Sequence, residues 1–313
     1  MRPEALCRSY IGLEAVEAYR LMDDHRDVLA TVKSILTTSY RIHLGPAGEH
    51  FIMESFEALL ECGTDPNTAV LSDLFANRRA ECRRLGLWKD RGTYKEGSLL
   101  RSIKIVGCAN LRGVVVDVGA DDNRMGQVLL KACHDTSAVI GVDIDTRTPL
   151  TEPGRLFFKR QEDPTKLPID DGYADTVIMR FSLHHMNFDT QNALLADARR
   201  ILKPAGRLVI FEDTYSTLLP PLVNHHIHAQ FMNLGDPTKY LITLAFLDAS
   251  SCFVLDETMP FYFSFRSMEE WQDQLSALGF KKCRVDYWGI PFFSLFQAPL
   301  GVIVYELDAW NPA

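Results

Sequence analysis

Two carboxylates accompany short apolar runs of the sequence, and the second is placed to bind a sugar diol. The first run, 114–118, contains Asp117 and is followed by Gly119, and the second, 138–142, ends at Asp143. Glycine lets the backbone approach a ligand closely because it has no side chain. A carboxylate after the second run is placed to accept hydrogen bonds from ribose hydroxyls. The spacing predicts a strand, a glycine turn, a helix and a second strand, with a nucleotide-type site at their carboxyl end.

Two adjacent histidines follow a later apolar run. His184 and His185 come shortly after the run 176–179, so they are expected at the same edge of a parallel sheet as Asp143. A histidine there can act as a general base when the substrate carries a proton that must leave. It can equally position a ligand or pack. His184 and His185 are therefore the catalytic candidates, with packing as the alternative.

Five other side chains are candidates for lining a substrate. Glu212 and Asp213 end a further apolar run, so each would orient a substrate or cap the next helix. His225 and His228 are spaced i, i+3 on an expected helix and could share a face as metal ligands. No third ligand accompanies them, so the sequence predicts no metal site. Tyr40, in the N-terminal region, would face substrate or pack.

The elements that must position these residues alternate along the chain. From 114 to 211, short apolar runs alternate with helical segments, which predicts an α/β fold with a parallel, doubly wound sheet. A helix is expected at about 267–278. Two strands, 281–288 and 301–307, follow it, and their spacing favours an antiparallel pair at the end of the sheet.

Two segments lie outside this alternation. Residues 1–105 are expected to be helical, with an amphipathic face interrupted at residues 45–48, and to form a lid or a dimerisation region. Residues 106–313 would form the core domain. Within it, the segment 214–264 follows a strand's carboxyl end and is expected to cover the substrate. A homodimer is compatible with these enclosing parts.

Composition narrows the partners and the compartment. The 313 residues are 47% hydrophobic and 24% charged, as in a globular enzyme, and the net charge of −8 argues against nucleic acid as the main partner. Seven cysteines without a CxxC pattern favour free thiols in a reducing compartment. With no secretory apolar core and no run of 18 apolar residues, the sequence predicts a soluble cytoplasmic protein with no membrane partner.

Five short motifs occur in one order in the middle third of the chain. They are Asp117-Val118-Gly119, Gly141-Val142-Asp143, the segment 163–175, Leu183-His184-His185 and the segment 201–207, whose Lys-Pro-Ala-Gly portion is expected to form a turn. Together they resemble the motifs of class I S-adenosylmethionine-dependent methyltransferases, of the small-molecule type with a methyltransferase-11-like core. The resemblance implies a Rossmann-like seven-stranded sheet and methyl transfer to a small organic molecule, with O, N and C all open as the acceptor atom.

The resemblance and the chemistry of the cofactor together assign its binding residues. Asp143 would bind the ribose diol and Asp163 the adenine edge, while Arg180 would pair with the carboxylate of the methionine tail. The full set of cofactor-binding candidates is Asp117, Gly119, Ala120, Asp121, Asp143, Ile144, Asp163, Pro164 and Arg180.

The glycine-rich motif departs from the family pattern. Where the family has three alternating glycines, this chain has Gly119, Asp121 and Asn123. Asp121 would bind the ammonium of the tail or weaken cofactor binding. The second outcome keeps open a methyltransferase-like partner or regulatory subunit without catalysis. A nicotinamide dinucleotide enzyme is disfavoured, because only Gly119 and the distant Gly126 are available for its glycine fingerprint.

Overall fold

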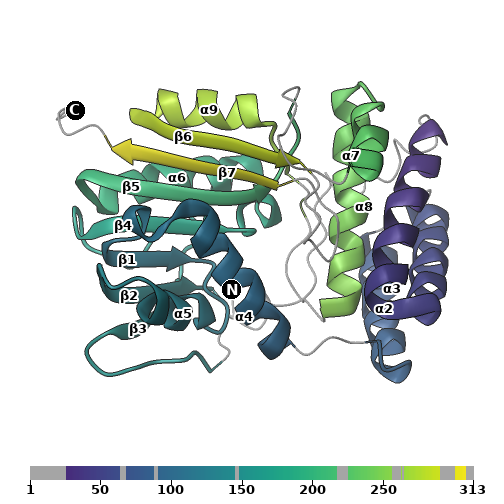
Figure 1. Cartoon of the computed structure of the whole chain (residues 1–313), viewed down its shortest axis with the longest axis horizontal. Helices are drawn as coiled ribbons and strands as arrows, with labels where there is room; N and C mark the ends of the chain where they lie inside the picture. Colours follow the sequence, from purple (N-terminus) through teal and green to yellow (C-terminus); the bar gives the residue numbers. More distant parts are fainter. Residues whose placement is uncertain are drawn as a thin grey trace.

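A computed structural model describes residues 26–63, 68–87, 91–144, 148–216, 225–255, 262, 264–289 and 300–307. Figure 1 shows a sheet flanked by helices beside a separate group of helices, hereafter the helical lobe. The carboxyl ends of the parallel strands point toward this lobe. Among the described helices, none is both long and apolar enough to cross a lipid bilayer.

The sheet has seven strands in the order β3-β2-β1-β4-β5-β7-β6. The first five are mutually parallel, and β7 runs antiparallel to both β5 and β6. The predicted doubly wound sheet with an antiparallel terminal pair is therefore confirmed. The strands are β1 Gly113–Val118, β2 Thr136–Asp143, β3 Leu156–Arg160, β4 Ala174–Arg180, β5 Leu202–Asp213, β6 Phe280–Gly289 and β7 Leu300–Leu307.

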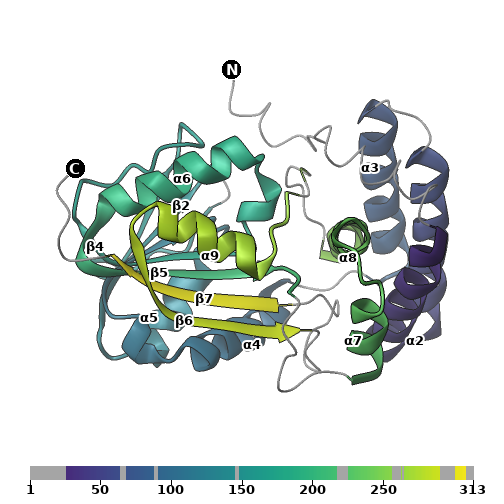
Figure 2. The same ribbon diagram turned by 90° about the horizontal axis from the view of Figure 1, so that it is seen from above.

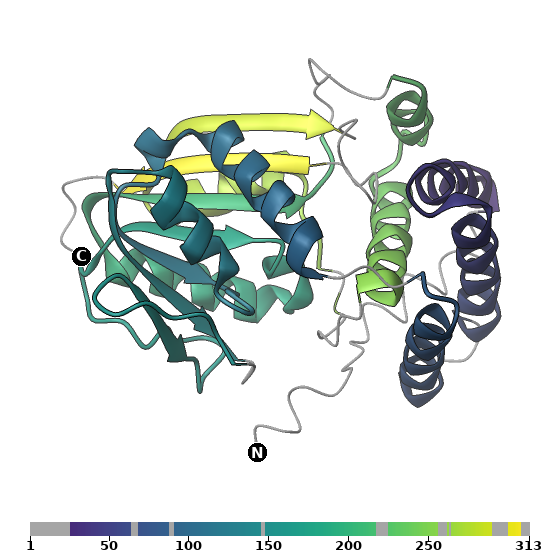
Figure 3. The ribbon, with the colours of Figure 1, turned by 60° about the horizontal axis from the view of Figure 1, so that its bottom comes forward.

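Helices cover both faces of the sheet, because its central strands are apolar on both sides. α4 (Arg91–Val106) and α5 (Arg124–Ala132) lie on one face, and α6 (Phe188–Ile201) and α9 (Met268–Ala277) on the other (Figures 2 and 3). Alternate residues of each strand serve the two cores: Val115 packs with α4 and α5, whereas Val116 packs with α6 and α9. This sandwich fixes the strand ends that carry the candidate residues.

The helical lobe is assembled from two distant parts of the chain. It consists of α2 (Arg26–Gly63), α3 (Thr68–Arg84), α7 (His225–Met232) and α8 (Pro237–Leu255). Ring pairs join the two parts: the ring centroids of Phe56 and Phe246 are 4.9 Å apart, as are those of Phe75 and Phe253. The expected interruption of the first helix lies at Gly45, which has a non-helical backbone with φ 71°. The segment 225–255 thus packs with the N-terminal helices.

Three details of the fold differ from expectation. The segment 203–206, predicted to be a turn, lies within β5, where a left-handed Ala205 (φ 60°) accompanies a shift in strand register. The edge strand β3 had not been located, since only its first residue is fully buried. The prediction that all cysteines are free was wrong: Cys108 and Cys133 form a disulfide between the segment before β1 and the end of α5.

Asn123 ties the loop after β1 to the next strands. It is fully buried, and its side-chain amide donates to the carbonyls of Leu150 (2.8 Å) and Phe157 (2.9 Å). Its Oδ1 lies so close to Gly141 that a Cβ there would be 2.4 Å away. β2 therefore needs glycine at this position.

Replacing Gly141 by alanine is expected to destabilise the protein by about 1–3 kcal/mol, the usual cost of overpacking a filled core. Urea denaturation measures the effect. Gly97→Ala is the matched control, because a Cβ at Gly97 in α4 meets nothing within 4 Å. Alanine is the better helix former, so the control should be neutral or slightly stabilising. Equal stability of the two variants would contradict the prediction.

Candidate functional site

The turn after β1 packs tightly against the ends of two neighbouring strands. Gly119 has φ 76°, and a Cβ there would lie 2.7 Å from Cβ of Ser182. The backbone amides of Gly119 and Ala120 both donate to the carbonyl of Val142, at 2.9 and 3.2 Å. Glycine is needed here for its backbone conformation and for the close approach.

The two positions where the family has further glycines also adopt left-handed backbone. Asp121 has φ 50° and Asn123 has φ 63°, a conformation that aspartate and asparagine adopt more readily than most residues. The amide of Asp121 donates to Oδ2 of Asp143 at 2.7 Å. The two non-glycine residues therefore keep the loop conformation, and the backbone amide of Asp121 anchors the loop to the predicted ribose-binding carboxylate.

Two buried polar groups beside this turn lack hydrogen-bond partners within the described part of the chain. They are Oδ2 of Asp117 and Oγ of Ser182, in residues each 3% exposed. Burial raises the pKa of Asp117 to about 7, and the charge of Arg180 opposes this rise. Buried polar atoms without partners are costly. A bound polar ligand would supply the missing partners.

Arg180 lies between this turn and helix α4. Its Nη2 donates to Oγ of Ser98 at 2.8 Å and its Nε to Oγ of Ser102 at 3.1 Å. The guanidinium also lies over the ring of Phe181, 4.7 Å from its centroid. Both hydroxyl partners are uncharged, so these two contacts do not neutralise the guanidinium. The two serines were not predicted, because nothing in the sequence links α4 to the end of β4.

The residues predicted at the adenine end lie farther out. Asp163 and Pro164 are exposed, and Ile144 is half-buried after β2. Oδ1 of Asp163 accepts hydrogen bonds from the hydroxyl (2.6 Å) and the amide (2.8 Å) of Thr165, which lower the pKa of Asp163. Asp163 thus stabilises a turn, and its role toward adenine stays a prediction.

His184 is the centre of a buried cluster. It lies in the short 3-10 helix Leu183–His185 after β4. Nδ1 of His184 is in a short contact with Oε2 of Glu212, and Nε2 of His184 is 3.6 Å from Oδ1 of Asp248 on α8. Oε1 of Glu212 also accepts hydrogen bonds from the backbone amides of Ser182 (3.0 Å) and Leu183 (2.8 Å). One carboxylate therefore fixes both the backbone and the side chain at this turn.

The charges around His184 decide its protonation. Burial favours the neutral ring, but the carboxylates of Glu212 and Asp248 raise the pKa of His184 well above its ordinary value. A protonated imidazole cannot accept a further proton. The cluster as described therefore favours a positioning role for His184 over the predicted general base.

The remaining predicted residues occupy different surroundings. His185 is 6% exposed, and the centroids of its ring and that of His184 are 4.2 Å apart. Burial raises the pKa of the half-buried Asp213 to about 7. Tyr40 is buried in the core of the helical lobe, and His228 is buried on α7 beside the ring of Tyr287.

The predicted pairing of His225 with His228 rests on a side chain outside the described residues, since only the backbone of His225 is described. Asp248 was not predicted at all. It is 64 positions from His184 in the sequence and belongs to no motif, so only the folded chain brings the two together.

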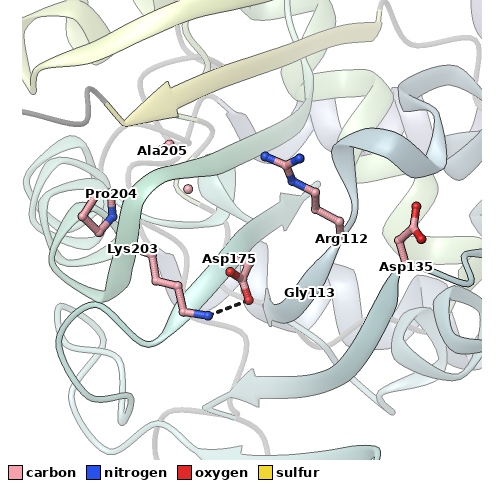
Figure 4. A pocket seen from close by; sticks show the side chains of 8 residues that line it. Arg112, Gly113, Asp135, Asp175, Lys203, Pro204 and Ala205 are labelled. Carbon is pink, nitrogen blue, oxygen red and sulfur yellow. Dashed lines mark hydrogen bonds and ion pairs between the residues drawn. The ribbon is translucent and has the colours of Figure 1, made fainter.

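A pocket of about 360 Å³ lies at the opposite end of the sheet, where β1, β4 and β5 begin. Its rim carries Arg112, Asp135 and the ion pair of Lys203 with Asp175, at 2.8 Å (Figure 4). It contains none of the predicted site residues. We therefore place the candidate site at the carboxyl ends of the strands.

The sequence of the central strands matches a known domain family. Residues 116–210 match the family described as methyltransferase domain. This central segment is a methyltransferase domain. The predicted methyltransferase family is therefore confirmed for this segment, and S-adenosylmethionine is the cofactor that this family implies. Asp117, Gly119, Asp143 and His184 all lie within the matched segment of this methyltransferase domain.

Curated relatives of this methyltransferase domain are ubiquinone/menaquinone biosynthesis C-methyltransferases named UbiE. The protein from Paraburkholderia phymatum is 32% identical over 114 residues, 34% of this chain and 45% of the relative. That from Paraburkholderia phytofirmans is 32% identical over 136 residues, 40% and 54% of the two chains. The chain spans about half the length of these curated relatives.

Solved structures with partial similarity include two methyltransferases. A Burkholderia thailandensis 1,6-didemethyltoxoflavin-N1-methyltransferase has a TM-score of 0.44 and 18% identity, covering 77% of this chain and 88% of its own. A methyltransferase from Aquifex aeolicus dependent on S-adenosylmethionine has a TM-score of 0.40 and 14% identity, covering 67% and 89%.

Proposed function

We propose that this chain transfers the methyl group of S-adenosylmethionine to a carbon atom of a small, largely apolar organic molecule. The observation that carries the proposal is the pair of buried polar atoms without partners, on Asp117 and Ser182, beside the Gly119 turn of a methyltransferase domain. Carbon is favoured as the acceptor because the curated relatives are named C-methyltransferases.

The residues at this turn fit the groups of the cofactor. Asp117 would accept hydrogen bonds from the ammonium of the methionine tail, and Arg180 would pair with the tail carboxylate. Asp143, held in place by the amide of Asp121, would bind the ribose hydroxyls. When bound, S-adenosylmethionine supplies an electrophilic methyl group on a sulfonium. The protein's contribution is then mainly alignment of the acceptor with that methyl group.

The junction between the sheet and the helical lobe favours an apolar acceptor. Phe265, which belongs to the lobe core, stacks on His184 with ring centroids 5.0 Å apart. The lobe stands opposite the carboxyl ends of the strands (Figure 1). We infer that α2, α3, α7 and α8 together cover the substrate. We also infer that Glu212, by holding His184, positions the residues that surround the substrate.

Calorimetric titration with S-adenosylmethionine and S-adenosylhomocysteine tests the first half of the proposal. Binding of one equivalent of either compound is expected, and no binding at millimolar concentration would contradict the enzyme function. The second half is tested by incubation with deuteromethyl-labelled cofactor and a panel of hydroxylated aromatic compounds. Mass spectrometry and NMR then show whether the label is on carbon, oxygen or nitrogen, and label on oxygen or nitrogen alone would reject carbon as the acceptor.

The pKa of Asp117 predicts a pH dependence of cofactor binding. The carboxylate attracts the ligand ammonium and the neutral acid does not, so affinity should be highest above pH 7 and fall as the pH drops through about 7. Below that value, the dissociation constant of S-adenosylhomocysteine should rise about tenfold per pH unit. Titrations from pH 5.5 to 8.5 measure this.

Asp117→Asn is the matched variant for this pH dependence, because it keeps the shape of the neutral acid. Its affinity should be low and independent of pH over the same range. A pH profile in the variant identical to that of the wild type would show that Asp117 is not the titrating group.

A further inference from the structure

Three buried side chains that could ligate a metal converge where the sheet meets the helical lobe. His184 and His185 follow β4, and Asp248 comes from α8. One ligand atom from each lies within 4.8 Å of the other two, and all three residues are at most 6% exposed. Two imidazole nitrogens and a carboxylate oxygen are a donor set that suits Zn²⁺ and related divalent transition metals.

Glu212 orients the first of these ligands. Its Oε2 contacts Nδ1 of His184, so Nδ1 carries the proton of that hydrogen bond, and Nε2 is the ring atom that faces Asp248. Metal-ligating histidines usually have such a carboxylate behind the ring, which fixes the tautomer and makes the other nitrogen more basic. The two backbone amides held by the same carboxylate fix its own position. His184 is thus pre-oriented as a metal ligand.

The distance across the cluster also fits a metal. Nε2 of His184 and Oδ1 of Asp248 are 3.6 Å apart, longer than a normal hydrogen bond. Ligands about 2.1 Å from a tetrahedral zinc ion lie about 3.4 Å from each other. Two atoms that both present lone pairs repel at this distance unless a cation lies between them. That cation is either a proton or a metal ion.

We propose that His184, His185 and Asp248 form a site for one divalent transition metal ion of the zinc class, with Glu212 holding His184 in position. The site would join the end of β4 to helix α8 and so link the sheet to the helical lobe. Three protein ligands leave a fourth coordination position open, as in catalytic zinc sites. This inference goes beyond the proposed function, and its tests use no S-adenosylmethionine.

Metal binding by the full-length protein is the primary test. After treatment with a chelator and its removal, titration with ZnCl₂ should give one tight equivalent. His185→Gln and Asp248→Asn should each weaken that binding at least tenfold. His134→Gln, an exposed histidine at the end of α5, should bind like the wild type. His228→Gln distinguishes this site from a site formed by His225 and His228. This variant should also bind the metal.

X-ray absorption spectroscopy on the zinc-loaded wild type keeps the test independent of how well the variants fold. The proposal requires two imidazoles among the ligands and no sulfur. Absence of zinc binding to the wild type at micromolar concentration would overturn it and leave a proton as the cation between His184 and Asp248. Sulfur ligation, or loss of the metal in His228→Gln with retention in folded Asp248→Asn, would also overturn it.

Discussion

Replacing Asp143 by alanine is expected to weaken binding of S-adenosylhomocysteine by about 100-fold or more. Hydrogen bonds to a charged group contribute roughly 1.5–3 kcal/mol each, and the ribose diol would lose two of them. A loss of about 3 kcal/mol corresponds to about 100-fold in the dissociation constant. The substitution also removes the acceptor of the Asp121 amide, so the turn loses its anchor to β2. Isothermal titration calorimetry measures the change.

Asp135→Ala is the control for this variant. Asp135 is an exposed aspartate at the opposite end of β2, on the rim of the pocket in Figure 4. Its removal should leave the affinity within twofold of the wild type. Near-wild-type affinity in Asp143→Ala would show that the ribose is bound elsewhere and that the turn after β1 is not the cofactor site.

Glu212→Gln should have the largest effect on stability, a loss of about 3–5 kcal/mol in the free energy of unfolding. The glutamate is 1% exposed, and it accepts hydrogen bonds from two backbone amides in addition to its contact with His184. Glutamine keeps the volume but loses the charge, so the buried His184 retains one carboxylate, Asp248, in place of two. Removing one partner of a buried ion pair usually costs this much.

Urea denaturation of the wild type and of Glu212→Gln at pH 7 measures the loss in the free energy of unfolding. Glu162→Gln is the control: its side chain is 76% exposed and pairs with Arg160 at 3.3 Å, and such surface pairs contribute at most about 1 kcal/mol. If Glu212→Gln were as stable as this control, the buried cluster would not stabilise the junction between sheet and lobe.

The sequence predicted the elements whose order depends on local patterns. The valines of β1 and the isoleucine and valines around Gly141 are continuous apolar runs, as buried parallel strands require, and the predicted terminal strands agree with β6 and β7 within one residue at each end. β3 was missed because an edge strand buries too little to produce such a run. The prediction of a turn at 203–206 was only partly right, because Ala174 pairs with Leu202 and so includes that segment in strand β5.

The site residues could be predicted where they belong to one local motif. They could not be predicted where segments distant in the sequence come together. Asp117, Gly119 and Asp143 follow from the pattern of two strands around a turn. The partnership of His184 with Asp248, and that of Arg180 with Ser98, join residues 64 and 82 positions apart. Such contacts depend on how helices dock, which no local spacing encodes. The protonation of His184 likewise depends on carboxylates from two other elements.

The divided origin of the helical lobe has a consequence for biosynthesis. Phe56 meets Phe246 and Phe75 meets Phe253, so the apolar faces of α2 and α3 must wait for about 180 further residues to leave the ribosome. Contacts of such high sequence separation form slowly, because chain closure precedes any gain from packing. During that interval, the nascent chain exposes hydrophobic surface of the kind that molecular chaperones bind. Synthesis of the lobe is therefore a stage at which this chain is prone to aggregate.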